Sequence, residues 1–421
     1  MADIGSPNFR SEEKLRSEET TSKVSTEILI IGGGIAGTST AYYLSQYGHK
    51  VTLLEQSEIA AEASGLNAGT LWATGWGTPA DLSTTLSMGG LQIYQSLQFD
   101  LGYDIEFRQC GALKVIQTEE EYAFISAHVH DLKSQGHNVE LLKGRDARCI
   151  EPELSPHLLG SLYYPLGASA DPVKTTRAFA SAAQQHGARI YLNHAVSAIA
   201  SNDNGTYVVT TPQAVFHTKI LLIAAGPWSR PIGAMLGLNI PVYAVRGQMW
   251  STGPVPTRIF HTIGAAESAL YWNKHPGDTT TQPLELTHQN GVRLTRHLYG
   301  RQTRDGEIIF GGDRQLNQEK IPEQSGIETN REHSCEIFPF LRSFPIQRTW
   351  AGWMPFTPSL EPLIGKLPYF EHLYILSGLS SSGFEQGPMA GKLLADYIHS
   401  GVASPMLEAA DPARQVTIPP T

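Results

Sequence analysis

The first recurring pattern of apolar and polar residues lies near the N-terminus. Residues 27–31 (EILII) are mostly apolar and lead into three glycines, which is typical of a buried parallel strand. Residues 35–48 follow with helical spacing and end in glycine, and residues 49–56 (HKVTLLEQ) form a second apolar run. We expect ordered structure to begin at Thr26. Strand, helix and strand in this order predict one right-handed βαβ unit.

The rest of the chain mixes helical and strand-like periodicity. Helices are expected over residues 119–136 and 173–187, a strand over 188–200, and a pair of strands around Gly111 within 107–117. Residues 241–343 alternate in the manner of antiparallel strands, and Arg304-Asp305-Gly306 is a hairpin signal. Residues 373–398 close the chain as strand, glycine-rich turn and helix.

This order predicts an α/β protein, α+β overall, with a discontinuous architecture. A Rossmann-like nucleotide-binding domain is expected over residues 25–80, 150–236 and 346–421. A second domain, built on an antiparallel sheet, takes residues 81–149 and 237–345. A chain of 421 residues also exceeds the size at which single cores stop growing. Residues 1–24 are polar and charged without an apolar stretch, so we expect a disordered lead-in and no secretory signal.

Composition narrows the classes of partner and compartment. The formal net charge of −9 argues against nucleic acid as the main partner. Cys110, Cys149 and Cys335 are far apart and show no CxxC spacing, which predicts neither a metal site nor a disulfide framework. Such thiols suit a reducing compartment, so we expect a cytoplasmic protein. No window of eighteen uninterrupted apolar residues occurs, so no transmembrane segment is expected.

A glycine fingerprint sits between the first expected strand and helix. Gly32, Gly34 and Gly37 form GxGxxG, in which the glycines allow a tight turn, close approach of a pyrophosphate, and close helix–strand packing. Glu55, at the end of the second strand, is placed to accept hydrogen bonds from ribose hydroxyls. The combination predicts a dinucleotide site, against the alternative of a tight turn in an ordinary βαβ unit. The fingerprint alone does not separate FAD from NAD.

Several segments resemble the D-amino acid oxidase superfamily of FAD enzymes, which includes glycine oxidase, sarcosine oxidase and D-amino acid dehydrogenases. They follow the superfamily's order and are residues 27–56, 63–71 (ASGLNAGTL), 170–190 (ADPVKTTRAFASAAQQHGARI), 221–229 (LLIAAGPWS), 349–365 (TWAGWMPFTPSLEPLIG) and 373–398. The resemblance implies an FAD-binding domain and a substrate domain. It further implies an oxidoreductase that oxidises the C–N bond of a small amine or amino acid by hydride transfer to flavin N5.

The resemblance also implies cofactor contacts at glycine-rich turns, where backbone must lie close to a flat ring and a pyrophosphate. In chain order the implied residues are Gly32, Gly34, Ile35, Ala36, Gly37, Glu55 and Gln56 for the ADP half; Ser64, Asn67, Ala68, Gly69, Thr70 and Leu71 in the following loop; Val196 at the adenine; Ala225, Gly226, Trp228 and Gly352 beside the cofactor; and Gly378, Ser381, Ser382, Gly383 and Phe384 near the pyrimidine end of the flavin. Some relatives tether the flavin to a cysteine or a histidine. Neither 350–358 nor 63–69 contains one, so we expect non-covalent FAD.

One departure concerns the substrate. Glycine oxidase-like members show Trp-Ala-Gly-Leu-Arg-Pro where this chain has Met354 at the arginine position. A thioether cannot clamp a carboxylate as an arginine does. Either another cation anchors the acid, or the substrate lacks a carboxylate there.

Candidate substrate-site residues come from the second domain. They are Arg246, Tyr271, Trp272, His297 and Tyr299, together with Met354; each also suits an ordinary core or surface position. Trp72 and Trp76 are expected to cover the flavin or simply to pack. Oxygen or an electron carrier would reoxidise the flavin. Two alternatives remain open: a biosynthetic flavoenzyme that dehydrogenates a larger amine-bearing intermediate, and a non-catalytic FAD-binding assembly protein.

Overall fold

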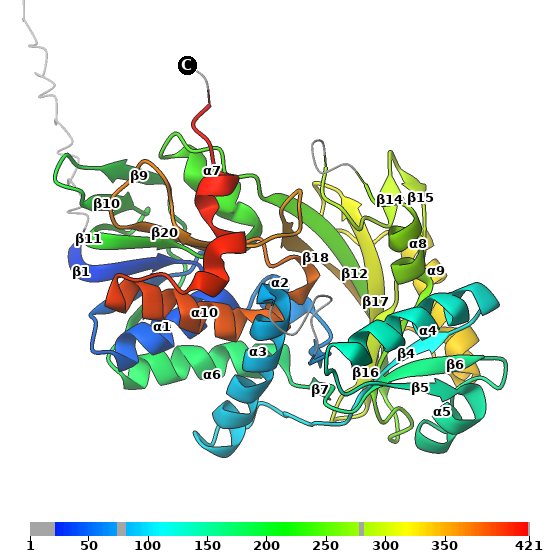
Figure 1. The fold of residues 1–421 in the computed structure, drawn as a ribbon. Helices are drawn as coiled ribbons and strands as arrows, with labels where there is room; N and C mark the ends of the chain where they lie inside the picture. The colour runs from blue at the N-terminus through cyan, green and yellow to red at the C-terminus, as the bar shows by residue number, and fades with distance from the viewer. Residues whose placement is uncertain (1–21, 74–80, 278–281, 420–421) are drawn as a thin grey trace, which may run out of the picture.

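The computed structural model describes residues 22–73, 81–277 and 282–419. These residues form two eight-stranded sheets that stand side by side, each covered by helices (Figure 1). In the described ranges no helix has the length and apolar character that crossing a membrane requires.

The first sheet has the strand order β19-β20-β11-β1-β2-β8, with β10 and β9 extending from β11. Its strands β8, β2, β1, β11 and β20 run parallel, and β19 closes the edge antiparallel. The last four residues of β1 and all of β2 are buried and nearly all apolar, because both faces of the sheet are covered there. The strands are β1 (Ser22–Ile31), β2 (Val51–Leu54), β8 (Arg189–Tyr191), β9 (Ala198–Ser201), β10 (Tyr207–Thr210), β11 (Ala214–Ile223), β19 (Leu363–Lys366) and β20 (Leu373–Ser377).

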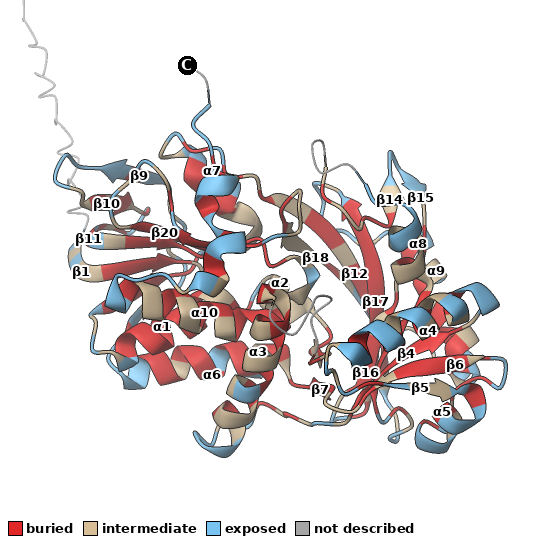
Figure 2. Ribbon diagram, viewed as in Figure 1, coloured by how far each residue is buried: buried red, intermediate tan, exposed pale blue. Residues whose placement is uncertain are grey.

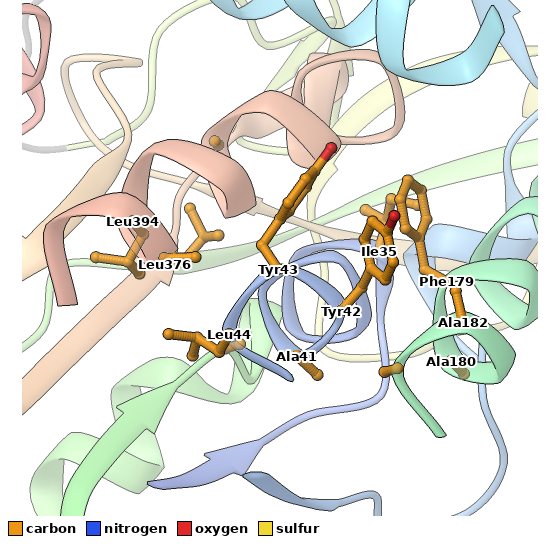
Figure 3. Close-up of a cluster of buried hydrophobic side chains, with 14 of the residues drawn as sticks. Ile35, Ala41, Tyr42, Tyr43, Leu44, Phe179, Ala180, Ala182, Leu376 and Leu394 are labelled. Atoms are coloured by element: carbon orange, nitrogen blue, oxygen red, sulfur yellow. The ribbon is translucent and has the colours of Figure 1, made fainter. Parts of the chain in front are cut away.

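Helix α1 (Ile35–Gln46) is the centre of the layer below this sheet (Figure 1). It lies between α6 (Pro172–Gln185) and α10 (Gly383–Ser400), and nearly all of its residues are buried. Figure 3 shows the contact, in which the ring of Tyr42 meets Phe179 of α6 at 6.1 Å between centroids. On the other side Gly391 of α10 lets the helices approach, because a side chain there would overlap Ser39.

The second sheet has the order β18-β12-β17-β16-β13-β4-β6-β5. It is antiparallel apart from the parallel pair β13–β4. Its strands are β4 (Ala112–Ile116), β5 (Glu140–Lys143), β6 (Gly160–Tyr164), β12 (Tyr243–Pro254), β13 (Thr262–Ala265), β16 (Tyr299–Gln302), β17 (Glu307–Leu316) and β18 (Arg348–Phe356).

One face of the second sheet packs on α9 (Gln324–Ile337). The fully buried Trp250 lies in this core with Phe310 and Phe338, and its indole N–H donates to the Asn330 side chain at 2.9 Å. Figure 2 shows the buried strands beneath helices whose outer faces are exposed. The remaining elements are α2 (Ala63–Leu66), α3 (Leu82–Phe99), α4 (Glu119–Ser134), α5 (Gly144–Ile150), α7 (Ser229–Ala234), α8 (Glu267–Lys274), β3 (Thr70–Leu71), β7 (Ala168–Ser169), β14 (His288–Gln289) and β15 (Val292–Arg293).

The predicted fold class, the βαβ unit and the hairpin are confirmed. β1, α1 and β2 follow in order with β1 and β2 parallel. β16 and β17 pair antiparallel across the predicted turn, where the Gly306 N–H donates to the Thr303 carbonyl. Helices α4 and α6 begin and end within two residues of the expected ranges.

Three predicted strand boundaries are wrong. β1 begins at Ser22, before Thr26, because its first residues pair with the long strand β11. The pair of strands around Gly111 is a single strand, β4, preceded by an isolated bridge from Arg108 to Ser169. The strand expected over 188–200 is two strands with different partners, since β8 pairs with β2 and β9 with β10. The remainder of the expected lead-in, residues 1–21, lies outside the described residues.

The predicted domain boundaries disagree with the packing at three elements. β6 and β18 fall in the expected nucleotide-binding segments but pair in the second sheet. α3 falls in an expected substrate segment but packs on α10. β18 and α3 contact elements remote in the sequence, so the local pattern does not record these contacts, whereas β6 pairs with the preceding strands β4 and β5 across the expected boundary at residue 150.

Gly37 provides a test of the packing between β1 and α1. A methyl group at Gly37 would overlap the carbonyl oxygen of Gly32, and backbone cannot move aside cheaply. We expect Gly37→Ala to lower the free energy of unfolding by about 1–3 kcal/mol, measured by denaturant titration. Gly253→Ala is the control, because nothing lies within 4 Å of its added methyl group. Equal stability of Gly37→Ala and the wild type would contradict the described contact.

Candidate active site

A cavity of about 800 Å³ extends from the glycines after β1 to the second sheet. Residues of both sheets line it, among them Gly32, Glu55 and Ala225 at one end and Trp272, Tyr299 and Arg314 at the other. A cavity shared by two structural units, with few polar groups converging on it, is the usual form of a cofactor and substrate site.

At the end of the cavity near β1, the shape depends on glycines, which have no side chain to fill the space. Gly32 has φ +117°, a conformation that other residues rarely adopt, and a side chain there would overlap the Ala224 carbonyl. Gly34 caps α1, and a methyl group on it would come within 3.0 Å of Ser64 Oγ. The first-turn N–H groups of a helix lack intrahelical partners, and here the Ile35 N–H donates to Ser64 Oγ at 2.9 Å. The cradle therefore suits a phosphate group at the helix N-terminus.

Glu55 lies at the same end and is almost fully buried. Its Oε2 accepts a hydrogen bond from the Gly33 N–H at 2.7 Å, and its Oε1 accepts one from the Ser57 N–H at 2.8 Å. A carboxylate offers about four acceptor positions, so ribose hydroxyls can share it. The carboxylate thus links the end of β2 to the glycine turn and still faces the cavity.

Most of the predicted cofactor residues line this cavity. They are Gly32, Gly34, Ile35, Ala36, Glu55, Gln56, Ser64, Asn67, Thr70, Val196, Ala225, Gly226, Trp228, Gly352, Ser381, Ser382, Gly383 and Phe384. The predicted contacts that lie outside the lining are Gly37, Ala68, Gly69, Leu71 and Gly378. Of these five, Gly37 and Gly69 lie against backbone carbonyls, Gly378 lies against the Thr357 side chain, and Ala68 and Leu71 are fully buried.

A row of paired residues crosses the second sheet and faces the cavity. In register order it runs from Lys114 through Gly264, Tyr299 and Gly311 to Met249. The two glycines leave room for bulky neighbours. A side chain at Gly264 would meet the Trp72 ring at 2.8 Å, and one at Gly311 would overlap Met249. Trp72 lines the cavity, whereas Trp76 lies outside the described residues.

Arg314 enters the cavity because β17 is irregular. Gly311 faces the cavity row, so strict alternation would point Arg314 to the opposite face. Between the pairs Gln248–Gly312 and Arg246–Gln315, however, β17 has one more residue than β12. Asp313 takes the left-handed conformation, with φ +62°. This β-bulge turns Arg314 into the cavity lining, a common use of bulges beside functional sites.

The Arg314 guanidinium is held from three sides. One terminal nitrogen donates to the Glu285 carboxylate at 2.6 Å, and the other donates to Ser381 Oγ at 2.9 Å. Its carbon lies 4.4 Å from the centre of the Trp272 ring. Ser381 belongs to the turn after β20, so Arg314 lies where the second sheet meets the predicted flavin turn. Neither Arg314 nor Glu285 was among the predicted site residues.

Four of the six candidate substrate-site residues line the cavity: Trp272, His297, Tyr299 and Met354. His297 Nδ1 lies 2.8 Å from Ser268 Oγ. Burial, with the nearby charges of Arg314 and Lys114, holds the pKa of His297 well below its usual value, so the ring is neutral. Burial raises the pKa of Tyr299 to about 12, so its hydroxyl keeps its proton.

The other two candidates, Tyr271 and Arg246, lie outside the cavity lining. Tyr271 stacks on His275, with 4.3 Å between ring centroids. Arg246 is buried and pairs with Glu323 at 2.7 Å, and it also donates to the Ile321 carbonyl. Its charge is therefore satisfied away from the cavity, and we withdraw both residues as substrate contacts.

Two further buried ionisable residues line the cavity and were not among the predicted site residues. Burial lowers the pKa of Lys114 on β4 to about 7. Burial raises the pKa of Glu385, in the first turn of α10, to about 7, although hydrogen bonds from the Ala73 and Trp72 N–H groups oppose the shift. The Ala73 N–H donates to Glu385 Oε1 at 2.7 Å, so this carboxyl ties the Trp72 segment to α10.

Comparison with known proteins identifies the family. Residues 27–397 match the family described as FAD dependent oxidoreductase. The chain belongs to this family. The family's cofactor fits the glycine cradle at α1 and the acceptor at Glu55, and the predicted superfamily, FAD cofactor and oxidoreductase class are confirmed.

Individual relatives cover most of the chain. A D-amino acid dehydrogenase of Neisseria gonorrhoeae is 27% identical over 88% of this chain and 95% of that protein. A glycine oxidase of Bacillus licheniformis is 26% identical over 88% of this chain and 92% of that protein. The solved structure of glycine oxidase from Geobacillus kaustophilus superimposes with a TM-score of 0.79 over 92% of this chain and 98% of that one, at 21% identity. This last likeness shows the fold alone.

Glu385 gives a prediction for the pH dependence of stability. Its pKa is about 7 in the folded protein and about 4.5 in the unfolded chain, so the folded state binds more protons between these values. Its contribution to stability is complete below pH 4.5 and is lost as pH rises to 7. We expect Glu385→Gln, which cannot ionise, to gain about 3 kcal/mol relative to the wild type over this range. If the unfolding free energies of the wild type and of Glu385→Gln changed with pH in the same way, the raised pKa of Glu385 would be contradicted.

Proposed function

We propose that this FAD-dependent oxidoreductase oxidises the C–N bond of a small amino acid, with hydride transfer to flavin N5. The observation that carries the proposal is the position of Arg314, a cation in the cavity beside the Ser381 turn. The names of two relatives, a D-amino acid dehydrogenase and a glycine oxidase, support the same substrate class.

The cofactor's place follows from the cavity lining. The turn at Gly32 to Gly34 and the first-turn N–H groups of α1 would hold the pyrophosphate, and Glu55 the ribose. The Ser381–Gly383 backbone would face the pyrimidine end of the ring. When bound, FAD supplies the two-electron acceptor for the reaction. Residues 350–358 and 63–69 contain neither cysteine nor histidine, so we propose that FAD is held without a covalent bond.

Arg314 supports an amino acid over a simple amine. A guanidinium binds a carboxylate through two parallel hydrogen bonds, which fixes both the position and the orientation of the acid. Met354, at the position where relatives carry arginine, lies in the same lining and offers only a thioether. Of the two options left open by Met354, we therefore favour another cation as the anchor, and that cation is Arg314.

The neutral His297 is suited to the other end of the substrate. Its contact with Ser268 fixes one ring nitrogen, and the second can accept a hydrogen bond from the substrate amine. Trp72, Trp272 and Tyr299 surround this space and exclude water. The aromatic lining and the placed cation support an enzyme over a non-catalytic assembly protein. The three free cysteines agree with the cytoplasm as the proposed compartment.

The direct test is anaerobic reduction of the bound flavin by a panel of small D- and L-amino acids and matching amines. We expect at least one amino acid to bleach the flavin absorbance, and its decarboxylated amine to do so far more slowly. Hydrogen peroxide formed in air would identify oxygen as the acceptor, whereas reoxidation only by an added dye would indicate a carrier. If no amine or amino acid bleaches the flavin, the proposed function is wrong.

Arg314→Met tests the anchor itself. We expect kcat/KM for the amino acid to fall about 100-fold or more, chiefly through KM, because a partner of a buried charged hydrogen bond is lost. The matching amine should change by much less. Arg348→Gln is the control, since Arg348 is an exposed cation of β18 outside the cavity lining. An equal loss for amino acid and amine would show that Arg314 has only a structural role.

A further inference from the structure

We propose that Glu285 is a specificity-determining residue, whose carboxylate occupies Arg314 in the free enzyme and must yield it to the carboxylate of the substrate. The proposal rests on the proposed function and names a second residue of the same site. It follows from the contacts of the guanidinium, from the freedom of the Glu285 side chain, and from the charge balance of the exchange.

Both terminal nitrogens of Arg314 already have partners. Glu285 Oε2 takes one terminal nitrogen at 2.6 Å, and Ser381 Oγ takes the other at 2.9 Å. A hydroxyl can rotate and change partners at little cost, but the Glu285 carboxylate holds its nitrogen by charge as well as by a hydrogen bond. A substrate acid can bind both terminal nitrogens through two parallel hydrogen bonds only after Glu285 has left.

Arg314 keeps its position when Glu285 leaves. Its backbone N–H donates to Thr287 Oγ1 at 2.7 Å, and its carbonyl accepts from the Thr287 N–H at 2.9 Å. The guanidinium also lies over the faces of Trp272, at 4.4 Å, and Phe356, at 5.8 Å. The anchor is therefore set in place by its strand and by two aromatic rings, independently of Glu285.

Glu285 is free to move where Arg314 is not. Its side chain is 36% exposed, against 8% for Arg314, so it has a route to solvent. The residues after it are fixed, because the Leu286 carbonyl accepts from the Trp272 indole at 3.0 Å and Thr287 pairs with Arg314. Rotation of the Glu285 side chain alone is thus enough. The φ of +55° at Glu285 is rare for a residue with a side chain and is held by this anchored neighbour.

The exchange conserves charge within the site. One carboxylate leaves the guanidinium as another arrives, so an amino acid is accepted without a buried unpaired charge. A substrate without a carboxylate leaves Glu285 in place and gains nothing from Arg314. Glu285 therefore lowers the affinity for acids and leaves the affinity for neutral ligands unchanged, and in this way it sets the preference between them.

The experiment uses the FAD-loaded enzyme and two probes of the same shape, acetate and acetamide, titrated against the flavin absorbance. We expect Glu285→Gln to bind acetate about two- to fivefold more tightly, the range of a partly exposed ion pair, with acetamide unchanged. Glu323→Gln is the matched control, because Glu323 pairs with Arg246 outside the cavity lining and should leave both affinities unchanged.

A double-mutant cycle completes the test. In the Arg314→Met background, Glu285→Gln should no longer affect acetate binding, since the shared partner is gone. The proposal is overturned if Glu285→Gln weakens acetate binding, tightens acetate and acetamide equally, or acts equally without Arg314. Absence of acetate binding in both the wild type and Glu285→Gln would overturn it as well. Acetate binding requires no turnover, so this result is separate from whether an amino acid reduces the flavin.

Discussion

The close contact between the end of β1 and the start of α1 is the constraint on which the site depends. Gly37 lies against the Gly32 carbonyl, and Gly32 in turn lies against Ala224 at the end of β11. With no side chains between them, the two strands and the helix meet at one point. That meeting directs the α1 N-terminus into the cavity and lets Glu55 reach back to the Gly33 N–H. Any widening there would displace the helix N-terminus that faces the phosphate position.

The second sheet contributes chemistry by a different means. Its row of residues from Lys114 to Met249 alternates large side chains with glycine, so that the Trp72 ring fills the space at Gly264 and the Met249 side chain fills the space at Gly311. The bulge at Asp313 then breaks the alternation once and adds the Arg314 guanidinium to this wall. In the proposed function, the first sheet would thus offer backbone donors to the cofactor, and the second would offer side chains to the substrate.

How far the sequence predicts this arrangement depends on the distance over which each feature is encoded. The βαβ unit and the Asp305-Gly306 hairpin are local, and they were predictable from periodicity and turn residues. The placement of β18 was not, because its partner β12 is remote in the chain, and β6 was placed on the wrong side of the expected boundary although it pairs with the nearby strands β4 and β5. Arg314 was missed because alternation along β17 points it away from the cavity. A bulge reverses this direction, and its left-handed residue is Asp313, where a glycine or proline would have indicated an irregular strand. Arg246 was predicted instead, because its ion-pair partner Glu323 lies 77 positions away and the local sequence does not reveal the pair.

The contact between Glu385 and the Ala73 N–H has a consequence for how the enzyme is made. It joins two residues that are 312 positions apart in the chain, one directly after Trp72 and the other in the first turn of α10. During synthesis the glycine cradle leaves the ribosome early, but the Trp72 segment gains this partner only when α10 has emerged. A nascent chain that stops before α10 therefore carries the glycine fingerprint but leaves the Ala73 N–H without the Glu385 carboxylate.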